Sequence, residues 1–307
     1  MIRPSTLKPG DKIGIVATAR RIRREDVAKA IEVLEGWGLH VVLSPWLFNE
    51  DHSYLAGSDQ QRHAALQQFI DDPSVRAILC ARGGYGTTRI LDDIRWTEMF
   101  KTPKWVVGFS DITAFHLKLQ TMGLQSIHGT MPALFGSPDA GPSVESLRKL
   151  LFGETETLMA TLSSHNRKGT AQGMLVGGNL SLIVDSLGTD YEVDTSGRIL
   201  ILEEVDEYLY KIDRMMVQLK RAGKLDRLAG LAIGHFTEIK DTELSFGETF
   251  EAIIRYHTRS SQYPIGFNFP VGHINPNTAW VSGETALFDV SNSGSSLRTA
   301  TGRDSET

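Results

Sequence analysis

The sequence contains almost no cysteine, and this excludes several kinds of site. Cys80 is the one cysteine among 307 residues, so the chain can form neither an internal disulfide nor a cluster of thiolates around a metal. Cys80 lies within the apolar, strand-like stretch RAILC. A cysteine hydrolase of the amidotransferase kind needs its nucleophile on the turn after a strand, so Cys80 is better interpreted as a small buried residue.

Long apolar runs and a one-sided charge are also missing. The N-terminal stretch MIRPSTLKPGDKIGIVATA lacks the apolar centre of a signal peptide, and no run is long enough to span a bilayer. We therefore expect a cytoplasmic protein with no membrane partner. The formal net charge is -5 and the densest basic run, residues 20–24, is short, so we expect no nucleic-acid partner. No spacing of His, Asp and Glu resembles a metal site, and we expect no metal.

What the sequence does contain is an alternation of short β-branched runs and helical stretches from residue 11 to about residue 150. With 41% hydrophobic and 22% charged residues, its balance is that of an ordinary globular protein. The alternation predicts an α/β fold, with a doubly wound, Rossmann-like parallel sheet in residues 1–152. In such a sheet the functional groups gather at the carboxyl ends of the strands. Two motifs follow strands in this way: ARGGYG after VRAILC, and GFSD after KWVV.

A change of composition marks the predicted domain boundary. Residues 153–170 lose the periodic apolar pattern and gain Thr, Ser, Gly and charge, so we interpret them as a linker. Residues 171–307 mix strands, helices and Gly-rich turns, which predicts a smaller, β-rich C-terminal domain. AWVSGETALFDV, which begins at Ala279, is a strand-rich stretch of this second part.

Ser110 is a candidate nucleophile. It follows an apolar run and a glycine in the stretch VVGFSDIT. A sharp turn from strand to helix at this point would expose the hydroxyl and aim helix N–H groups at an oxyanion bonded to it. The pattern G-x-S-x-I lacks the second glycine of the common nucleophile elbow, however, and serine is also a preferred N-cap. Taken alone, Ser110 is more simply interpreted as the cap of the following helix.

The ARGGYG motif offers two adjacent glycines, Gly83 and Gly84, directly after a strand. Such glycines permit a positive φ and the close approach of backbone N–H donors to a ligand. A plain turn between strand and helix has the same composition. The motif is not a spaced G-x-G-x-x-G and no P-loop lysine follows it, so we expect no nucleotide cofactor.

Carboxylates and histidines in the second half could complete a catalytic set. Glu203 and Glu204 end a strand, and strand alternation sends them to opposite faces, so at most one can orient a histidine. Of the nine histidines, His273 is the best placed, because a glycine precedes it and the turn-forming NPN follows. His128 and His235 also follow strand-like runs. His116 lies on a helical stretch with apolar neighbours, and we interpret it as structural.

Together and in this order, several motifs resemble the LD-carboxypeptidase family of serine peptidases, which also contains the microcin C immunity peptidases. They are LKPGDKIGIVA, ARGGYG, GFSD, HGTMP, GGNLSL, LEEVDE followed by YKIDRMM, and PVGH, and they cover nearly the whole chain. The resemblance implies a Ser–His–Glu triad in which Ser110 matches the nucleophile, His273 the base and Glu203 the acid. It changes the interpretation of Ser110 from a cap to a nucleophile.

The resemblance also implies the rest of the chemistry. The backbone N–H of Asp111 and of a residue in the Gly83–Gly84 turn would form the oxyanion hole, and an acyl-enzyme would form on Ser110 and be hydrolysed. No metal or organic cofactor is needed, and a homodimer is expected. The substrate would be a small cytoplasmic muropeptide, from whose tetrapeptide the enzyme removes the terminal D-alanine during cell-wall recycling.

Two alternatives to this function are open. Family members with the microcin immunity role cleave a peptidyl or aminoacyl nucleotide, and we expect in them a longer insertion with an aromatic residue that stacks on the base. Residues 153–175 contain no Trp, Tyr or Phe, which favours the carboxypeptidase. A non-catalytic protein that binds a small ligand is disfavoured, because Ser110, Glu203 and His273 are all present.

A carboxypeptidase must also hold the free carboxylate of its substrate, and a guanidinium does this with two parallel hydrogen bonds. Arg82 directly precedes the Gly83–Gly84 turn and is our candidate for substrate binding. Arg214 lies on a helical stretch next to Asp213, where a surface pair is the simpler interpretation. The backbone N–H donors of the glycine turn are the competing explanation for carboxylate binding.

Overall fold

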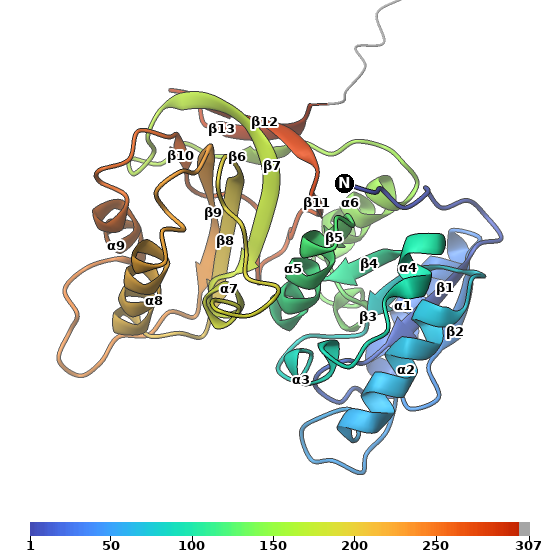
Figure 1. The fold of residues 1–307 in the computed structure, drawn as a ribbon. Helices are drawn as coiled ribbons and strands as arrows, with labels where there is room; N and C mark the ends of the chain where they lie inside the picture. The colour runs from blue at the N-terminus through green and yellow to red at the C-terminus, as the bar shows by residue number, and fades with distance from the viewer. Residues whose placement is uncertain (301–307) are drawn as a thin grey trace, which may run out of the picture. The chain divides into compact units, whose positions relative to one another are not determined.

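The computed structural model describes residues 1–300, which divide into two compact units. Unit 1 comprises Met1–Glu154 and Thr278–Val281, and unit 2 comprises Thr155–Asn277 and, among the described residues, 282–300 (Figure 1). Among residues 1–300, no helix combines the length and the apolar character needed to cross a membrane.

Unit 1 contains a six-stranded sheet, with the strand order β11-β5-β4-β3-β1-β2. Its strands are β1 (Lys12–Val16), β2 (His40–Leu43), β3 (Val75–Cys80), β4 (Trp105–Gly108), β5 (Ser126–His128) and β11 (Trp280–Ser282). The pairs β1–β2, β1–β3, β3–β4 and β4–β5 are all parallel. The strand order reverses between β1 and β3, and the loops after strands at such a point form the usual ligand crevice of an open α/β sheet. The predicted doubly wound parallel sheet is confirmed.

Helices cover both faces of this sheet. The helices and short 3₁₀ turns of unit 1 are α1 (Arg24–Gly36), α2 (Asp59–Asp71), α3 (Thr88–Leu91), α4 (Thr97–Lys101), η1 (Ser110–Ile112), α5 (Thr113–Thr121), η2 (Pro132–Leu134) and α6 (Gly141–Leu151). Leu34 of α1 and Leu147 of α6 belong to one apolar core with strand residues such as Ile15. On α2, Phe69 packs against Gly14, where an added Cβ would lie 2.6 Å from the ring. The small residue in β1 therefore lets α2 approach the sheet closely.

Unit 2 contains a seven-stranded mixed sheet, with the strand order β10-β9-β8-β7-β12-β13-β6. Its strands are β6 (Leu158–Ala160), β7 (Gly169–Asn179), β8 (Ile199–Val205), β9 (Gly230–Thr237), β10 (Ile265–Gly266), β12 (Thr285–Val290) and β13 (Ser295–Thr299). The pairs from β7 to β10 are parallel, and β7–β12, β12–β13 and β13–β6 are antiparallel. The helices are α7 (Leu180–Asp185), α8 (Leu209–Arg221) and α9 (Phe250–His257). Parallel neighbours need a crossover connection. Helix α7 lies in the connection from β7 to β8, and α8 lies in the connection from β8 to β9.

The boundaries of the units differ from the predicted ones in two places. The expected linker, residues 153–170, contains β6, which pairs with β13 and belongs to unit 2. β6 is a three-residue edge strand whose central Met159 is exposed, so it leaves no clear alternation in the sequence. The stretch from Ala279 is not one strand region, because β11 joins the sheet of unit 1 and β12 joins that of unit 2, with a turn at Gly283 between them.

Candidate active site

Ser110 lies on the turn between β4 and α5, in a backbone conformation that few L-residues adopt. Its φ is 64°, in the left-handed region. The residues at the cap positions of η1 and α5 are Phe109 and Ile112, and neither start has a side-chain cap hydrogen bond. An N-cap residue normally has extended backbone, so the N-cap interpretation of Ser110 is wrong. Strained non-glycine residues of this kind recur at functional sites, and a nucleophile elbow is one of them.

Two glycines make room for this turn. An ideal Cβ at Gly108 would lie 2.8 Å from Cγ1 of Ile112, so the isoleucine side chain occupies the space beside β4. An ideal Cβ at Gly83 would lie 3.1 Å from Oγ of Ser110 and 3.4 Å from the backbone N of Asp111. Any side chain at residue 83 would therefore press on the Ser110 hydroxyl. The structure brings the ARGGYG loop against the Ser110 turn, as the strand-end argument expects.

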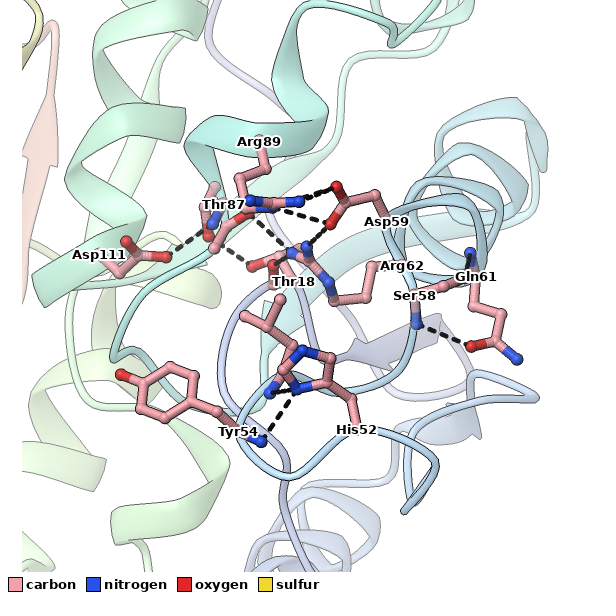
Figure 2. A network of polar contacts seen from close by, with 12 residues as sticks. Thr18, His52, Tyr54, Ser58, Asp59, Gln61, Arg62, Thr87, Arg89 and Asp111 are labelled. Atoms are coloured by element: carbon pink, nitrogen blue, oxygen red, sulfur yellow. Dashed lines mark hydrogen bonds and ion pairs between the residues drawn. The ribbon is translucent and has the colours of Figure 1, made fainter.

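The Asp111 side chain connects the two loops. It is 1% exposed, and its Oδ2 accepts a hydrogen bond of 2.9 Å from the backbone N–H of Thr87 (Figure 2). Burial raises the pKa of the Asp111 carboxyl, and the hydrogen bonds from Thr87 and Gly86 oppose that rise. The carboxylate thus fixes the end of the glycine loop relative to the residue that follows Ser110.

His116, on α5, is hydrogen-bonded to the last residue of β4. Its Nε2 donates to the carbonyl of Gly108 at 2.9 Å, and its Nδ1 accepts from the hydroxyl of Ser126 at 2.8 Å. Burial lowers the pKa of His116 to about 4, so the ring is neutral near pH 7. The prediction that His116 is structural is confirmed by these bonds.

Arg82 lies half-buried between β3 and the glycine turn. Its Nη1 donates to the carbonyl of Arg21 at 3.4 Å, and its Nε is buried without a hydrogen-bond partner among residues 1–300. Burial and the nearby charge of Arg20 lower the pKa of Arg82, and Asp26 opposes them. At Gly84, whose φ is 118°, an added Cβ would lie 2.9 Å from Cβ of Arg20. The aliphatic part of the Arg20 side chain therefore lies against the turn that follows Arg82.

The competing candidates in the sequence have other partners. Arg214 lies over the Tyr210 ring, 5.6 Å from its centroid, and Asp213 pairs with His257 at 2.7 Å. The expected Asp213–Arg214 surface pair is thus replaced by these contacts. Cys80 is fully buried at the end of β3, and burial raises the pKa of its thiol to about 12. A thiol of this kind is not a nucleophile near neutral pH.

In unit 2, Glu203 and His273 form a hydrogen-bonded pair. Oε2 of Glu203 lies 2.9 Å from Nδ1 of His273, the glutamate side chain is fully buried, and the histidine side chain is 24% exposed. Burial alone would lower the pKa of His273, but the hydrogen bond and charge of Glu203, with the charges of Glu204 and Glu238, raise it. A donor at Nδ1 leaves Nε2 as the nitrogen that can accept a proton, which is the arrangement of a base with its orienting acid.

The backbone around this pair explains how the two side chains meet. Between β8 and β9 the register shifts at Glu203, where a bulge interrupts the ladder. The segment that carries His273 lies along β9, because the N–H of His235 donates to the carbonyl of Val271 at 2.9 Å. Gly272 has a φ of 118°, and a Cβ there would lie 3.0 Å from Oε2 of Glu203. The glycine before the histidine is therefore needed for the pair to form.

Glu204 points to different partners from its neighbour. Its carboxylate accepts hydrogen bonds from Nδ2 of Asn179 at 2.9 Å, from the N–H of Ser181 at 2.9 Å and from Oγ of Ser181 at 2.6 Å. Burial raises the pKa of Glu204, and these bonds oppose the rise. The expectation that only one of the two glutamates can orient a histidine agrees with these contacts. The role of Glu204 as an anchor for the start of α7 was not predicted, since GGNLSL gave no sign of a buried acceptor opposite it.

The structure places the two remaining candidate histidines, His128 and His235, in different surroundings. His128 is fully buried at the end of β5 and stacks on Trp280, with ring centroids 5.1 Å apart. Burial lowers the pKa of His235. Within residues 1–300, no group of three or more His, Cys, Asp or Glu side chains is arranged to hold a metal ion.

Two family models match this chain. Residues 13–129 match the N-terminal domain and residues 172–287 the C-terminal domain of the LD-carboxypeptidase family. The chain belongs to the LD-carboxypeptidase family. It is therefore a serine-type carboxypeptidase, and the predicted family and α/β fold are confirmed.

Relatives and solved structures extend over nearly the whole chain. A probable murein peptide carboxypeptidase of Bacillus subtilis is 38% identical, over 94% of this chain and 92% of its own length. The murein tetrapeptide carboxypeptidase of Pseudomonas aeruginosa is 30% identical, over 94% and 97%. The crystal structure of muramoyltetrapeptide carboxypeptidase from Oxalobacter formigenes matches with a TM-score of 0.86 at 26% identity, over 94% and 98%. The microcin C7 self-immunity protein, at 18% identity, has a TM-score of 0.86 over 97% and 98% and shows the shared fold.

Proposed function

We propose that this carboxypeptidase removes the terminal D-alanine from muropeptide tetrapeptides, with Ser110, His273 and Glu203 as its catalytic triad. The observation that carries the proposal is the strained Ser110 turn with Gly83 pressed against it. The hydrogen-bonded pair of Glu203 and His273 supports it, because it supplies a base whose acid partner is already in place. The names of the family relatives, which act on murein peptides, support the class of substrate.

The reaction follows from these groups. Nε2 of His273 takes the Ser110 proton, and Oγ of Ser110 attacks the carbonyl of the L-to-D peptide bond. The backbone N–H groups of Asp111 and of Gly83 or Gly84 stabilise the oxyanion that develops. His273 then protonates the amine of the leaving D-alanine, and water hydrolyses the acyl-enzyme. Arg82 holds the terminal carboxylate of the substrate during these steps.

The direct test is incubation of the purified protein with a muropeptide tetrapeptide, followed by mass spectrometry. We expect the tripeptide and free alanine, and no product with the Ser110→Ala variant. A substrate recovered intact at high enzyme concentration would refute the proposed substrate. A location in the cytoplasm and a homodimeric state belong to the same proposal, and light scattering of the purified chain checks the second.

Cleavage of a peptidyl or aminoacyl nucleotide is the second candidate. The reason to consider this activity is the fold that the chain shares with the microcin C7 self-immunity protein. The absence of Trp, Tyr and Phe from residues 153–175 favours the muropeptide. An aminoacyl nucleotide analogue offered beside the tetrapeptide decides between them by the ratio of the two kcat/KM values.

A further inference from the structure

Arg62, in α2, is buried behind the glycine loop. The residue is 1% exposed, although arginine is rarely buried without charged and hydrogen-bonding partners. Its Nη2 pairs with Asp59, one turn earlier on the same helix. Its Nη1 donates to two backbone carbonyls, that of Thr18 and that of Gly86, the second at 2.7 Å (Figure 2). One guanidinium therefore connects α2 to the loops that follow β1 and β3.

The glycine loop is shaped around this guanidinium. Gly86 has a φ of 137°, and a Cβ there would lie 2.9 Å from Nη1 of Arg62 and 2.8 Å from Cδ2 of Leu55. Both the backbone conformation and the space require glycine. Gly86 lies three residues after Gly83, whose backbone lies against Ser110. The carbonyl that Arg62 holds thus belongs to the loop that supplies the proposed oxyanion donors.

A second set of bonds carries this arrangement to the nucleophile. Next to Gly86, the N–H of Thr87 donates to Oδ2 of Asp111 at 2.9 Å. Oγ1 of Thr87 also lies 2.9 Å from Oγ1 of Thr18. The network in Figure 2 therefore joins the loops after β1, β3 and β4, and it ends at the residue whose backbone follows Ser110.

We propose that Arg62 is a positioning residue, which holds residues 83–86 so that their N–H groups face the oxyanion formed on Ser110. This inference rests on the proposed function, because the oxyanion arises in that reaction. Loss of the guanidinium would remove a buried donor from the Thr18 and Gly86 carbonyls, leave the Gly86 carbonyl with only the N–H of Arg89 at 3.2 Å, and loosen the loop. A displacement of about 1 Å at a reacting centre can reduce the rate by about 10²-fold. The loss of an interaction made in the transition state lowers kcat, while KM changes little.

The test compares Arg62→Met with Lys104→Met, a matched control. Lys104 is fully buried too, and its Nζ donates to two backbone carbonyls, that of Asp72 at 2.8 Å and that of Val75 at 3.2 Å. Those carbonyls lie at the end of α2 and at the first residue of β3, whereas the carbonyl of Gly86 lies after the end of β3. Both variants lose a buried cation that bonds two carbonyls, but only Arg62→Met frees the loop beside Ser110.

Two rates are measured under conditions where circular dichroism shows each variant folded. The first is the covalent labelling of Ser110 by a fluorophosphonate, in which Oγ displaces fluoride through an oxyanion-bearing transition state. The second is kcat on the muropeptide tetrapeptide. We expect Arg62→Met to be about 10²-fold slower than Lys104→Met in both. Arg62→Lys keeps the charge and can reach one carbonyl, so it should recover part of the loss.

Equal labelling rates for Arg62→Met and Lys104→Met would overturn the inference. If Arg62→Met does not fold, Arg62→Lys takes its place in the comparison, and labelling of Arg62→Lys as fast as Lys104→Met would overturn it equally. A wild-type protein that is not labelled at Ser110 is a different result. It would refute the proposed nucleophile itself, and the inference about Arg62 with it.

Discussion

Two histidines, one in each unit, differ in what surrounds them. His116 bonds to neutral groups, a carbonyl and a hydroxyl, and burial lowers its pKa to about 4. His273 is also withdrawn from water, yet its pKa is raised because the Glu203 carboxylate bonds to it. Burial acts on both rings in the same direction, so the carboxylate decides the difference. A buried histidine is structural or chemically active according to its partner.

The two units also present their candidate groups in different ways. Ser110 is presented by backbone: a left-handed φ, and glycines that leave room for the turn. His273 is presented by a side-chain pair with an ionisable acid. Unit 1 should therefore be sensitive to changes of backbone and volume, and unit 2 to changes of charge.

Removing the hydroxyl in unit 1 should have the largest effect. Ser110→Ala should lower kcat by about 10⁴ to 10⁶, the range found when a triad member is deleted. The side chain contributes little to the core, so the melting temperature should stay close to that of the wild type. Kinetics on the tetrapeptide and a thermal melt check both parts. An active Ser110→Ala enzyme would refute the mechanism.

Changing the charge in unit 2 should have the next largest effect. Glu203→Gln keeps the shape of the side chain but removes the charge that orients and stabilises the imidazolium, so we expect a loss of about 10²- to 10⁴-fold, less than for His273→Ala. The control is Glu204→Gln, whose carboxylate bonds to Asn179 and Ser181. Glu204→Gln should lower the melting temperature and have only a small effect on kcat. If Glu204→Gln is inactive and Glu203→Gln is fully active, Glu203 was wrongly assigned as the acid of the triad.

The guanidinium of Arg82 should affect the rate of cleavage through its interaction with the negatively charged terminal carboxylate of the substrate. Amidation of the terminal carboxylate should weaken cleavage by the wild type by about 10²-fold, the loss expected for a charge-assisted, two-bond contact. Arg82→Ala should remove most of the difference between acid and amide. The measurement is the ratio of kcat/KM for the two substrates. An unchanged ratio in Arg82→Ala would assign the carboxylate to another donor.

The pH profile should separate the two histidines. His273 must be neutral to accept the Ser110 proton, so activity should fall about tenfold per pH unit below its pKa, with an inflection above the ordinary 6.5 because the pKa is raised. The linkage to stability has the opposite sign. The Glu203–His273 interaction stabilises the folded state fully below about pH 6.5, and its contribution is lost as the pH rises through the raised pKa. A rate that is flat from pH 5 to 8 would contradict His273 as the base.

The last expected effect is on stability in acid, and it leaves the rate at neutral pH unchanged. His116 has a folded pKa of about 4, whereas the ordinary value is 6.5. Its contribution to the free energy of unfolding is therefore complete above pH 6.5 and is lost as the pH falls toward 4, on the order of 3 kcal/mol in all. His116→Gln should flatten this part of the curve, as measured by urea unfolding from pH 7 to 4. Equal slopes for variant and wild type would show that another group titrates.

The parts of the fold and of the candidate site that depend on local sequence patterns could be predicted from the sequence. The apolar runs that became β1, β3 and β4 are short, β-branched and bounded by turns, so their strands and the glycine loop after β3 were expected. β11 was not expected, because three residues next to β12 contain no signal that they pair in another sheet. Arg62 is a charged residue on the helix α2, so the sequence predicts a surface position for it. Its burial depends on carbonyls that the fold brings together from distant parts of the chain, and no helical periodicity encodes them.

The short strand β11 has a consequence for any attempt to divide this protein. Residues 278–281 return to the sheet of unit 1 after the chain has passed through most of unit 2, and the chain then re-enters unit 2. A gene fragment that stops at residue 154 would encode a sheet whose β5 lacks the neighbour it has in the full chain. The uncovered edge of β5 would present unpaired N–H and C=O groups, which are a template for association between chains. A truncated unit 1 should therefore aggregate, and recovery of its soluble form should require the β11 segment, supplied as a peptide or fused through a short connection.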